Sequence, residues 1–526
     1  MNFPLFIAFV LFAFRRALTY LHIFQQEEYD GARFSRWIFE QRSFDTRASL
    51  ALLALWILQL IHVTPAAVAS LIGAVALLAL MLIEKDPRKG SKKTLVMTAR
   101  AKRIYFTGLA MLIVLALLCT LLRVPLVFWM VLVQLIPFAL IAGTAATAPY
   151  EHKVQQRFWN EAHAKLGSLK PTVIGITGSF GKTSTKHLLG HILEVQAPTL
   201  ITPGSVNTPM GIARIVRERL GSHHRFFVCE MGAYGPGSIA RLCRLAPPDV
   251  GLITAIGMAH YERFKTLDAV AETKFELAEA VAKRGGPVII AEQVLEFAAA
   301  RAFRDKYRQQ TIVVGPGPEC SLRVISSAQT NAGIQAEVTW DGRTYLLKAP
   351  LYGEHHIMNM ALSFAAACSL GVPPEDAILA LASVPQISHR LEVKQGPAGA
   401  RLIDDAYNSN PVGFASGLRL LSELHANGGR RILVTPGMVE LGAAHDEEHR
   451  KIGELAGRYV DVLLPVLPER ISTLTQAYTA VNPQGTVIPC ANFAAARAWL
   501  DSNVRASDVI LMENDLPDLY ETKLRL

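Results

Sequence analysis

The stretch from Gly175 to Thr185, "GITGSFGKTST", lies between an apolar run, "PTVIGIT", and a helix-like run, "KHLLGHILEV". A strand, a glycine-rich turn, Lys-Thr and a helix together place backbone N–H groups, a helix N-terminus and a lysine around a polyphosphate. The common spacing has glycine where this chain has Ile176, so the loop is a variant of that pattern. We predict a nucleotide-phosphate site formed by Thr177, Gly178, Ser179, Phe180, Gly181, Lys182, Thr183 and Ser184.

Three further residues with chemical potential follow the loop. Glu230 ends the apolar run "FFVCE", His260 ends "VGLITAIGMAH", and Lys274 lies fourteen positions later inside the helical "VAETKFELAEAV". In open parallel sheets, ligands bind at the carboxyl ends of the strands. A lone histidine at a strand end is more often structural than a ligand, so residue types alone leave its role open.

These residues need a scaffold of alternating strands and helices. From residue 151 onward, short apolar runs alternate with helix-like segments, which predicts an α/β fold with a mostly parallel sheet. "TIVVG" followed by "AEVTWDGRTYLLKAP" predicts a hairpin-rich insertion. A second α/β unit of Rossmann-like type is expected to begin near Ala400. We therefore predict a central nucleotide-binding domain at 151–395 and a C-terminal domain at 396–526.

The first 150 residues predict a helical transmembrane region. Four apolar runs, at 48–63, 66–83, 104–122 and 125–143, are each close to the roughly 17 to 25 residues that cross a bilayer. The loop at 84–103 carries eight Lys or Arg against two acids, which favours the cytoplasm for this loop and for everything after residue 145. The N-terminal apolar run of about 13 residues before Arg15 is either a further span or an interfacial helix.

Composition supports this division. The 526 residues are 51% hydrophobic with a mean hydropathy of +0.26, too apolar for a wholly soluble protein. Six scattered cysteines without a CxxC pair suggest neither disulfides nor a zinc site. The net charge of +9 has its densest run between apolar segments, which favours a topology signal over nucleic-acid binding.

Several ordered motifs resemble those of the Mur ligases, most closely the D-alanyl-D-alanine-adding type. They are "GITGSFGKTS", "TPGSVNTPMG", "CEMGAYGPGS", "GEHHIMNMAL", "SHRLEV", "LIDDAYNSNP" and "GMVELG", and the resemblance covers roughly residues 170 to 460. It implies an ATP-dependent, Mg²⁺-requiring ligase that joins a carboxylate to an amine through an acyl phosphate. The loop without glycine at 176 is also the form typical of this family.

The resemblance implies a role for each chemical residue. Lys182 would hold the γ-phosphate, Thr183 and Glu230 would bind magnesium, and His260 a second metal ion. Lys274 matches a lysine that the family carbamylates, which turns a cation into an anionic oxygen ligand. Six further residues match family motifs: His355 and Asn359 at the adenine, Arg390 and Asp405 toward the nucleotide from the interdomain region, and Asn207 and Thr208 on the acceptor-side loop. A hinge is expected near 390–400.

Two regions depart from the family. Soluble Mur ligases begin with a domain that binds a uridine nucleotide, whereas this chain has membrane hairpins there. The family type usually ends with a Lys-Gly-Ser-Arg motif, whereas this chain has "LMENDLPDLY". We expect Glu513, Asp515 and Asp518 to form an exposed acidic turn, and recognition of a cationic amine by these residues is the alternative.

The sequence therefore predicts a multi-pass ligase of the bacterial inner membrane with cytoplasmic catalytic domains. Its partners would be the lipid bilayer, a small-molecule or lipid-linked envelope precursor of peptidoglycan type, and an amino acid or dipeptide, but not nucleic acid. A polymerising ligase resembling poly-γ-glutamate synthases and a non-catalytic ATP-binding scaffold remain alternatives. A transporter is less favoured because the hairpins carry almost no intramembrane charges.

Overall fold

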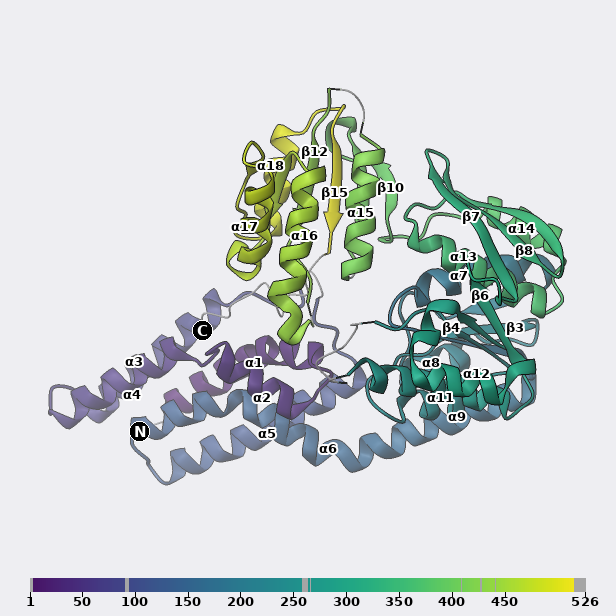
Figure 1. Ribbon diagram of the computed structural model, residues 1–526. Helices are drawn as coiled ribbons and strands as arrows, with labels where there is room; N and C mark the ends of the chain where they lie inside the picture. Colours follow the sequence, from purple (N-terminus) through teal and green to yellow (C-terminus); the bar gives the residue numbers. More distant parts are fainter. Residues whose placement is uncertain are drawn as a thin grey trace. The chain divides into compact units, whose positions relative to one another are not determined.

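The computed structural model describes residues 3–89, 94–257, 264, 266–407, 409–425, 428–439 and 441–514 (Figure 1). The chain divides into two compact units between Gln156 and Arg157. The first unit is entirely helical in its described part, and the second contains two β-sheets. The α/β fold predicted for the catalytic part and the helical N-terminal region are both confirmed.

Six helices begin the chain. They are α1 (Phe3–Gln26), α2 (Gly31–Glu40), α3 (Thr46–Leu60), α4 (Ala66–Ile83), α5 (Ala99–Leu121) and α6 (Leu126–Leu169). By length and composition, α1, α4, α5 and α6 are long and apolar enough to cross a membrane, and α3 is a shorter apolar helix. The N-terminal run is thus part of one continuous 24-residue helix. Helix α6 runs through the predicted domain boundary at residue 150.

Polar and small residues join the helices of the first unit. Arg16 of α1 and Asp45, which caps α3, form a buried ion pair at 2.9 Å. A Cβ atom at Gly108 would lie 2.6 Å from the carbonyl oxygen of Ala139, and one at Gly143 would lie 2.7 Å from that of Ile104. Helices α5 and α6 therefore cross at a distance that only glycine allows, as small residues do in membrane helix pairs.

The larger sheet of the second unit has nine strands in the order β2-β3-β1-β4-β5-β6-β7-β8-β9. The first six in this order are parallel, and β7, β8 and β9 form the predicted antiparallel insertion. The strands are β1 (Thr172–Thr177), β2 (Thr199–Ile201), β3 (Phe226–Glu230), β4 (Val250–Ile253), β5 (Val288–Ala291), β6 (Thr311–Gly315), β7 (Leu322–Thr330), β8 (Gly333–Trp340) and β9 (Arg343–Ala349).

In the described residues, the α-helices that accompany this sheet are α7 (Lys182–Gln196), α8 (Pro209–Arg219), α9 (Ser238–Leu245), α11 (Leu267–Ala282), α12 (Ala298–Lys306), α13 (His355–Ser369) and α14 (Pro374–Ala382). Strands β1, β3 and β4 are buried almost throughout, as expected for a parallel sheet covered on both faces. Their apolar runs explain why the sequence located them. Short 3₁₀ helices lie at Glu292–Glu296, Arg308–Gln310, Pro397–Gly399, Gly442–Ala444 and Pro468–Ile471.

The smaller sheet has six strands in the order β10-β11-β15-β12-β13-β14, and only β10 is antiparallel to its neighbour. They are β10 (Glu392–Gln395), β11 (Arg401–Asp405), β12 (Arg431–Thr435), β13 (Val462–Pro465), β14 (Thr486–Val487) and β15 (Val509–Glu513). The helices of this sheet are α15 (Pro411–Glu423), α16 (His445–Tyr459), α17 (Ser472–Val481) and α18 (Phe493–Asn503).

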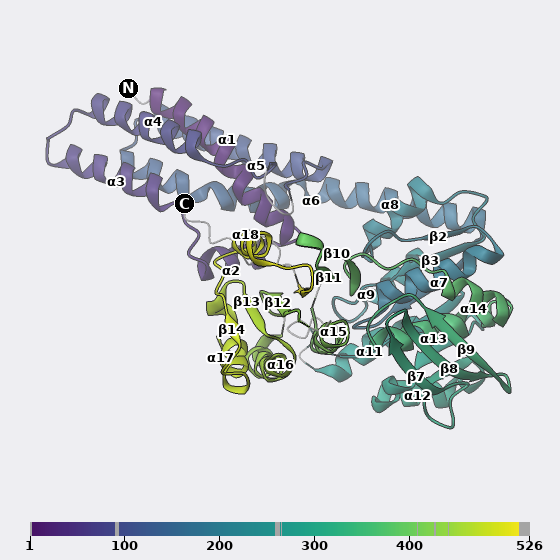
Figure 2. The ribbon, with the colours of Figure 1, turned by 90° about the horizontal axis from the view of Figure 1, so that it is seen from above.

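Alternation along these strands separates two apolar layers. Leu433 and Leu511 pack in the cluster that contains α15, α16 and α17, whereas Ile432 and Ile510 pack in the cluster that contains α18. Figure 2 shows α18 on one side of the sheet and the other three helices on the opposite side. This is the two-faced burial that a parallel sheet requires.

Candidate functional site

The glycine-rich loop connects β1 to α7 at the carboxyl edge of the larger sheet. Gly181 precedes α7 with a φ of 79°, and a Cβ atom there would lie 2.3 Å from Asn359 Oδ1. Gly178 has a φ of 155°, and a Cβ atom there would lie 1.9 Å from Thr254 Oγ1. Both positions therefore require glycine, because only a residue without a side chain lets the loop pack this closely against Thr254 and Asn359.

Hydrogen bonds hold this loop in shape. The Ser179 N–H donates to Ala255 O at 2.7 Å, and the Ser179 hydroxyl donates to Gly257 O at 3.0 Å. The Thr177 hydroxyl donates to Met231 O at 3.0 Å, and the Thr254 hydroxyl donates to Phe180 O. The loop is thus held by the segments that follow β4 and β3, and such preorganisation reduces the cost of ordering a loop on binding.

Lys182 begins α7, so its ammonium and the positive end of the helix dipole lie together. Its Nζ donates to the carbonyl oxygens of Gly178 at 2.7 Å and Ser179 at 3.3 Å. Burial lowers the pKa of Lys182 from its usual value. The glycines, the lysine and the helix N-terminus fit the polyphosphate of ATP.

Glu230 ends β3 and is only 2% exposed. Its Oε2 accepts a hydrogen bond from the Thr183 hydroxyl at 3.0 Å, and its Oε1 accepts one from Asn207 Nδ2 at 3.3 Å. Lys186 Nζ lies 3.4 Å from Glu230 Oε2. A hydroxyl oxygen and a carboxylate beside a polyphosphate loop are the hard ligands that Mg²⁺ prefers, so these residues fit that ion.

Lys274 lies on α11 and is 4% exposed. Burial, and secondly repulsion by the Lys182 ammonium, lower the pKa of Lys274 well below its usual value. Its amine is therefore disposed to be neutral, which is the form that reacts with carbon dioxide to give a carbamate. The predicted second-metal residue, His260, lies outside the described residues.

Helix α13 places two predicted nucleotide residues. Asn359 is buried against the glycine-rich loop, where its Oδ1 accepts a hydrogen bond from the Thr185 hydroxyl at 3.3 Å. His355 begins the helix, and burial lowers its pKa to about 4, so its imidazole is neutral. On the loop predicted to face the acceptor, Thr208 caps α8 by accepting a hydrogen bond from Gly211 N at 3.3 Å.

The linker near residue 390 carries backbone strain on both sides of Arg390. His389 has a φ of 60° and Leu391 a φ of 50°, which is uncommon for residues with side chains. The Leu391 N–H donates to Asp405 Oδ1 at 3.2 Å, and the Arg390 guanidinium carbon lies 4.5 Å from the centre of the Tyr407 ring. The predicted hinge region therefore contains two residues in a conformation that costs free energy.

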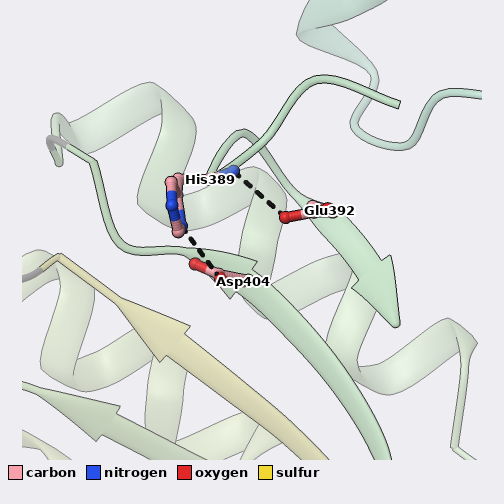
Figure 3. A group of neighbouring side chains, drawn as sticks. All are labelled: His389, Glu392 and Asp404. Carbon is pink, nitrogen blue, oxygen red and sulfur yellow. Dashed lines mark hydrogen bonds and ion pairs between the residues drawn. The ribbon is translucent and has the colours of Figure 1, made fainter. Parts of the chain in front are cut away.

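His389, Glu392 and Asp404 place one ligand atom each within 4.8 Å of one another at this linker (Figure 3). The His389 Nδ1 lies 3.0 Å from Asp404 Oδ2. Lys394 Nζ donates to Glu392 Oε2 at 3.1 Å and to Asp404 Oδ2 at 2.5 Å. A lysine ammonium thus already balances both carboxylates, and this cluster is an ion-pair network around the strained linker.

Asp405 and Glu513 end the adjacent strands β11 and β15 in register. Glu513 is fully buried, and the Ser409 hydroxyl donates to its Oε1 at 2.5 Å. Burial is the main cause that raises the pKa of Asp405 to about 6 and the pKa of Glu513 well above its usual value. The expectation that Glu513 belongs to an exposed acidic turn is wrong, and Asp515 and Asp518 lie outside the described residues.

Comparison with known proteins agrees with this arrangement. The Mur ligase middle domain matches residues 176–367, and the domain described as "Mur ligase, glutamate ligase domain" matches residues 389–513. The UDP-N-acetylmuramoyl-tripeptide–D-alanyl-D-alanine ligase of Mycobacterium tuberculosis is 32% identical over 368 residues, 65% of this chain and 70% of that protein. The Bacillus subtilis enzyme of the same name is 30% identical over 292 residues, 56% of this chain and 62% of that protein.

Solved structures agree on the fold. MurF ligase from Thermotoga maritima in complex with ADP is 25% identical, with a TM-score of 0.58 over 70% of this chain and 82% of that chain. MurF from Acinetobacter baumannii has a TM-score of 0.60 at 24% identity over 70% and 79% of the respective chains. The chain therefore belongs to the Mur ligase family of ATP-dependent ligases that form carbon–nitrogen bonds.

Proposed function

We propose that this chain is a membrane-anchored ligase that joins an amine to a substrate carboxylate of a cell-envelope precursor, at the cytoplasmic face of a bacterial inner membrane. Its catalytic part comprises a central domain, residues 151–395, and a C-terminal domain, residues 396–526. The observation that carries the proposal is the convergence of the glycine-rich loop, Thr183 and Glu230 at one edge of the larger sheet. A scaffold that only binds ATP has no need of the buried Lys274 beside Lys182.

Each residue has a role in this chemistry. ATP, when bound, supplies the phosphoryl group that activates the carboxylate. Lys182 and the N-terminus of α7 hold the γ-phosphate and balance its charge. Thr183 and Glu230 would hold Mg²⁺ through their oxygen atoms, and Lys274, as a carbamate, would hold a second cation together with His260. Arg390 and Asp405 reach the nucleotide from the linker and the C-terminal domain.

The acceptor is proposed to be lipid-linked. Four helices of the first unit are long and apolar enough to cross a membrane, and they stand where soluble members of the family carry a uridine-nucleotide domain. The relatives are named for a UDP-muramoyl tripeptide and for D-alanyl-D-alanine. We extend this to an acceptor of the same muropeptide class presented on a lipid, and to an amino acid or dipeptide as the amine.

The decisive experiment measures ADP release by the full-length protein in nanodiscs, with Mg²⁺ and a mixture of amino acids and dipeptides. Lipid-linked muropeptide is compared with its soluble UDP-linked precursor. We expect turnover at least tenfold faster with the lipid-linked acceptor, and none from the Lys182→Ala protein, which controls for contaminating ATPases. Equal turnover with both acceptors would show that the helices only anchor the protein. Absence of turnover with both acceptors would contradict the proposed substrate class.

A further inference from the structure

Lys186 is a fully buried lysine on α7, one turn after Thr183. Its ammonium lies 3.4 Å from Glu230 Oε2 and donates a hydrogen bond to the carbonyl oxygen of Gly204. Within the described part of the chain, no other lysine or arginine is within ion-pair distance of Glu230. Because burying an ammonium is costly unless it is paired and hydrogen-bonded, this position has a specific use for the charge.

The two partners of Lys186 belong to different segments. Glu230 ends β3, whereas Gly204 belongs to the loop between β2 and α8, which also contains Asn207. The Asn207 side-chain amide donates to the other carboxylate oxygen, Glu230 Oε1, at 3.3 Å, and the backbone carbonyl oxygen of Asn207 accepts a hydrogen bond from Gly232 N at 3.0 Å. The Glu230 carboxylate is therefore the common partner through which Lys186 and Asn207 fasten the 203–207 loop to the sheet.

The same carboxylate is the oxygen ligand offered to Mg²⁺. Glu230 Oε2 already accepts a hydrogen bond from the Thr183 hydroxyl and lies 3.4 Å from the Lys186 ammonium. A divalent cation that approaches this oxygen therefore comes close to the positive charge of Lys186. Two like charges in a buried site repel strongly because the medium screens them poorly. The lysine and the metal ion therefore compete for one oxygen, while the bond from Lys186 to Gly204 involves no metal ligand.

We propose that Lys186 is a positioning residue that holds Glu230 and the 203–207 loop together and yields Glu230 Oε2 to the divalent cation. Cation binding at the nucleotide is thereby coupled to the position of the loop predicted to face the acceptor. This inference rests on the proposed function for the identity of the cation site. It concerns how tightly the site binds the cation, and it does not depend on which acceptor is used.

The test compares the full-length wild type with Lys186→Met, which matches the side-chain length without the charge. ADP binding is measured by calorimetry while Mg²⁺ is titrated, and amide hydrogen exchange is followed in residues 203–207. We expect the Mg²⁺ concentration for half-maximal ADP binding to fall at least fivefold, because the competing charge is gone. We also expect exchange in the loop to rise at least tenfold, because the bond to Gly204 is lost.

Two further variants separate charge from structure. Lys186→Gln keeps a donor without the charge and is expected to lower the Mg²⁺ requirement like Lys186→Met, with a smaller rise in exchange. Lys165 of α6 donates a hydrogen bond to the backbone oxygen of Arg217 at 2.9 Å. Lys165→Met is the control and is expected to change neither the Mg²⁺ requirement nor the hydrogen exchange of the loop. An unchanged or higher Mg²⁺ requirement in Lys186→Gln would overturn the inference. Absence of ADP binding by the wild type would instead contradict the proposed function.

Discussion

The Thr183 hydroxyl donates to Glu230 Oε2 at 3.0 Å and joins the first turn of α7 to the end of β3. Because β1 lies beside β3, with Ile176 opposite Glu230, the glycine-rich loop and the carboxylate share one edge of the sheet. This contact links the loop proposed to hold the phosphates to the carboxylate proposed to bind Mg²⁺. It is the relationship from which the catalytic predictions follow.

Removing the loop lysine is expected to abolish ATP turnover. Lys182→Ala leaves the γ-phosphate without its cation, and we expect the rate of ADP release to fall at least 100-fold. Lys283→Ala is the matched control, since Lys283 follows α11 as an exposed residue paired with Glu279. If Lys182→Ala released ADP at the wild-type rate, Lys182 and its loop would have no role in ATP turnover.

Lys274 is expected to carry a carbamate. Its lowered pKa favours the neutral amine, so ¹³C-labelled bicarbonate should give a carbamate signal in the wild type that is absent from Lys274→Ala. We expect Lys274→Ala to lose at least 100-fold of the ligation rate and to recover in part with added acetate or formate, which replace the oxygen ligand. Full activity of the untreated variant would contradict this assignment.

Local patterns explain what the sequence could predict. The glycine-rich loop is specified by residues within eleven positions, Gly175 to Thr185, and the buried strands by their unbroken apolar runs. Strand β10 was not predicted because "EVKQ" has no apolar alternation, and it pairs with β11 at the edge of the smaller sheet, where none of its four residues is fully buried. Its pairing is set by the linker and by β11, not by its own composition.

Burial of charged side chains could not be predicted in this way. Lys186 lies in a helix, where lysine is usually exposed, and only the distant Gly204 and Glu230 provide its partners. Glu513 belongs to an acidic sequence that favours solvent, but its strand pairs with β11 and places it beside Asp405. The burial of both side chains depends on the tertiary arrangement, so Lys186 was missed as a candidate site residue in the sequence.

The Asp405–Glu513 pair is expected to make stability fall as pH rises. Both carboxyl groups have a raised pKa in the folded state, so the folded protein binds protons that the unfolded chain releases at about pH 4. Their stabilising effect is complete below pH 4 and is lost as pH rises through about 6, the value for Asp405, and beyond for Glu513. The loss from Asp405 alone is on the order of 3 kcal/mol, because one pKa unit corresponds to about 1.4 kcal/mol.

Glu513→Gln tests this by removing one titrating group while keeping a side chain that hydrogen-bonds to its neighbours. Thermal unfolding at pH 5 and pH 8 should show a smaller decrease in melting temperature for Glu513→Gln than for the wild type. Glu447→Gln, at an exposed residue of α16, is the control and should follow the wild type. Identical pH dependence in Glu513→Gln and the wild type would show that Glu513 does not have the raised pKa on which this prediction rests.

Deletion of residues 1–150 is expected to leave a folded core that binds ADP with Mg²⁺. The remaining part of α6 keeps Ala162 and Leu166, which are buried in the cluster that contains the larger sheet, so the cut spares the core. We expect the truncated protein to bind ADP within threefold of the wild-type affinity and to lose at least tenfold of its turnover on lipid-linked muropeptide in nanodiscs. A second truncation that also removes residues 151–169 should lower the melting temperature, because it removes Ala162 and Leu166 from the cluster and exposes the apolar residues around them. Undiminished turnover of the first truncation on the lipid-linked acceptor would show that the helices do not present the substrate, since the acceptor would then reach the site without them.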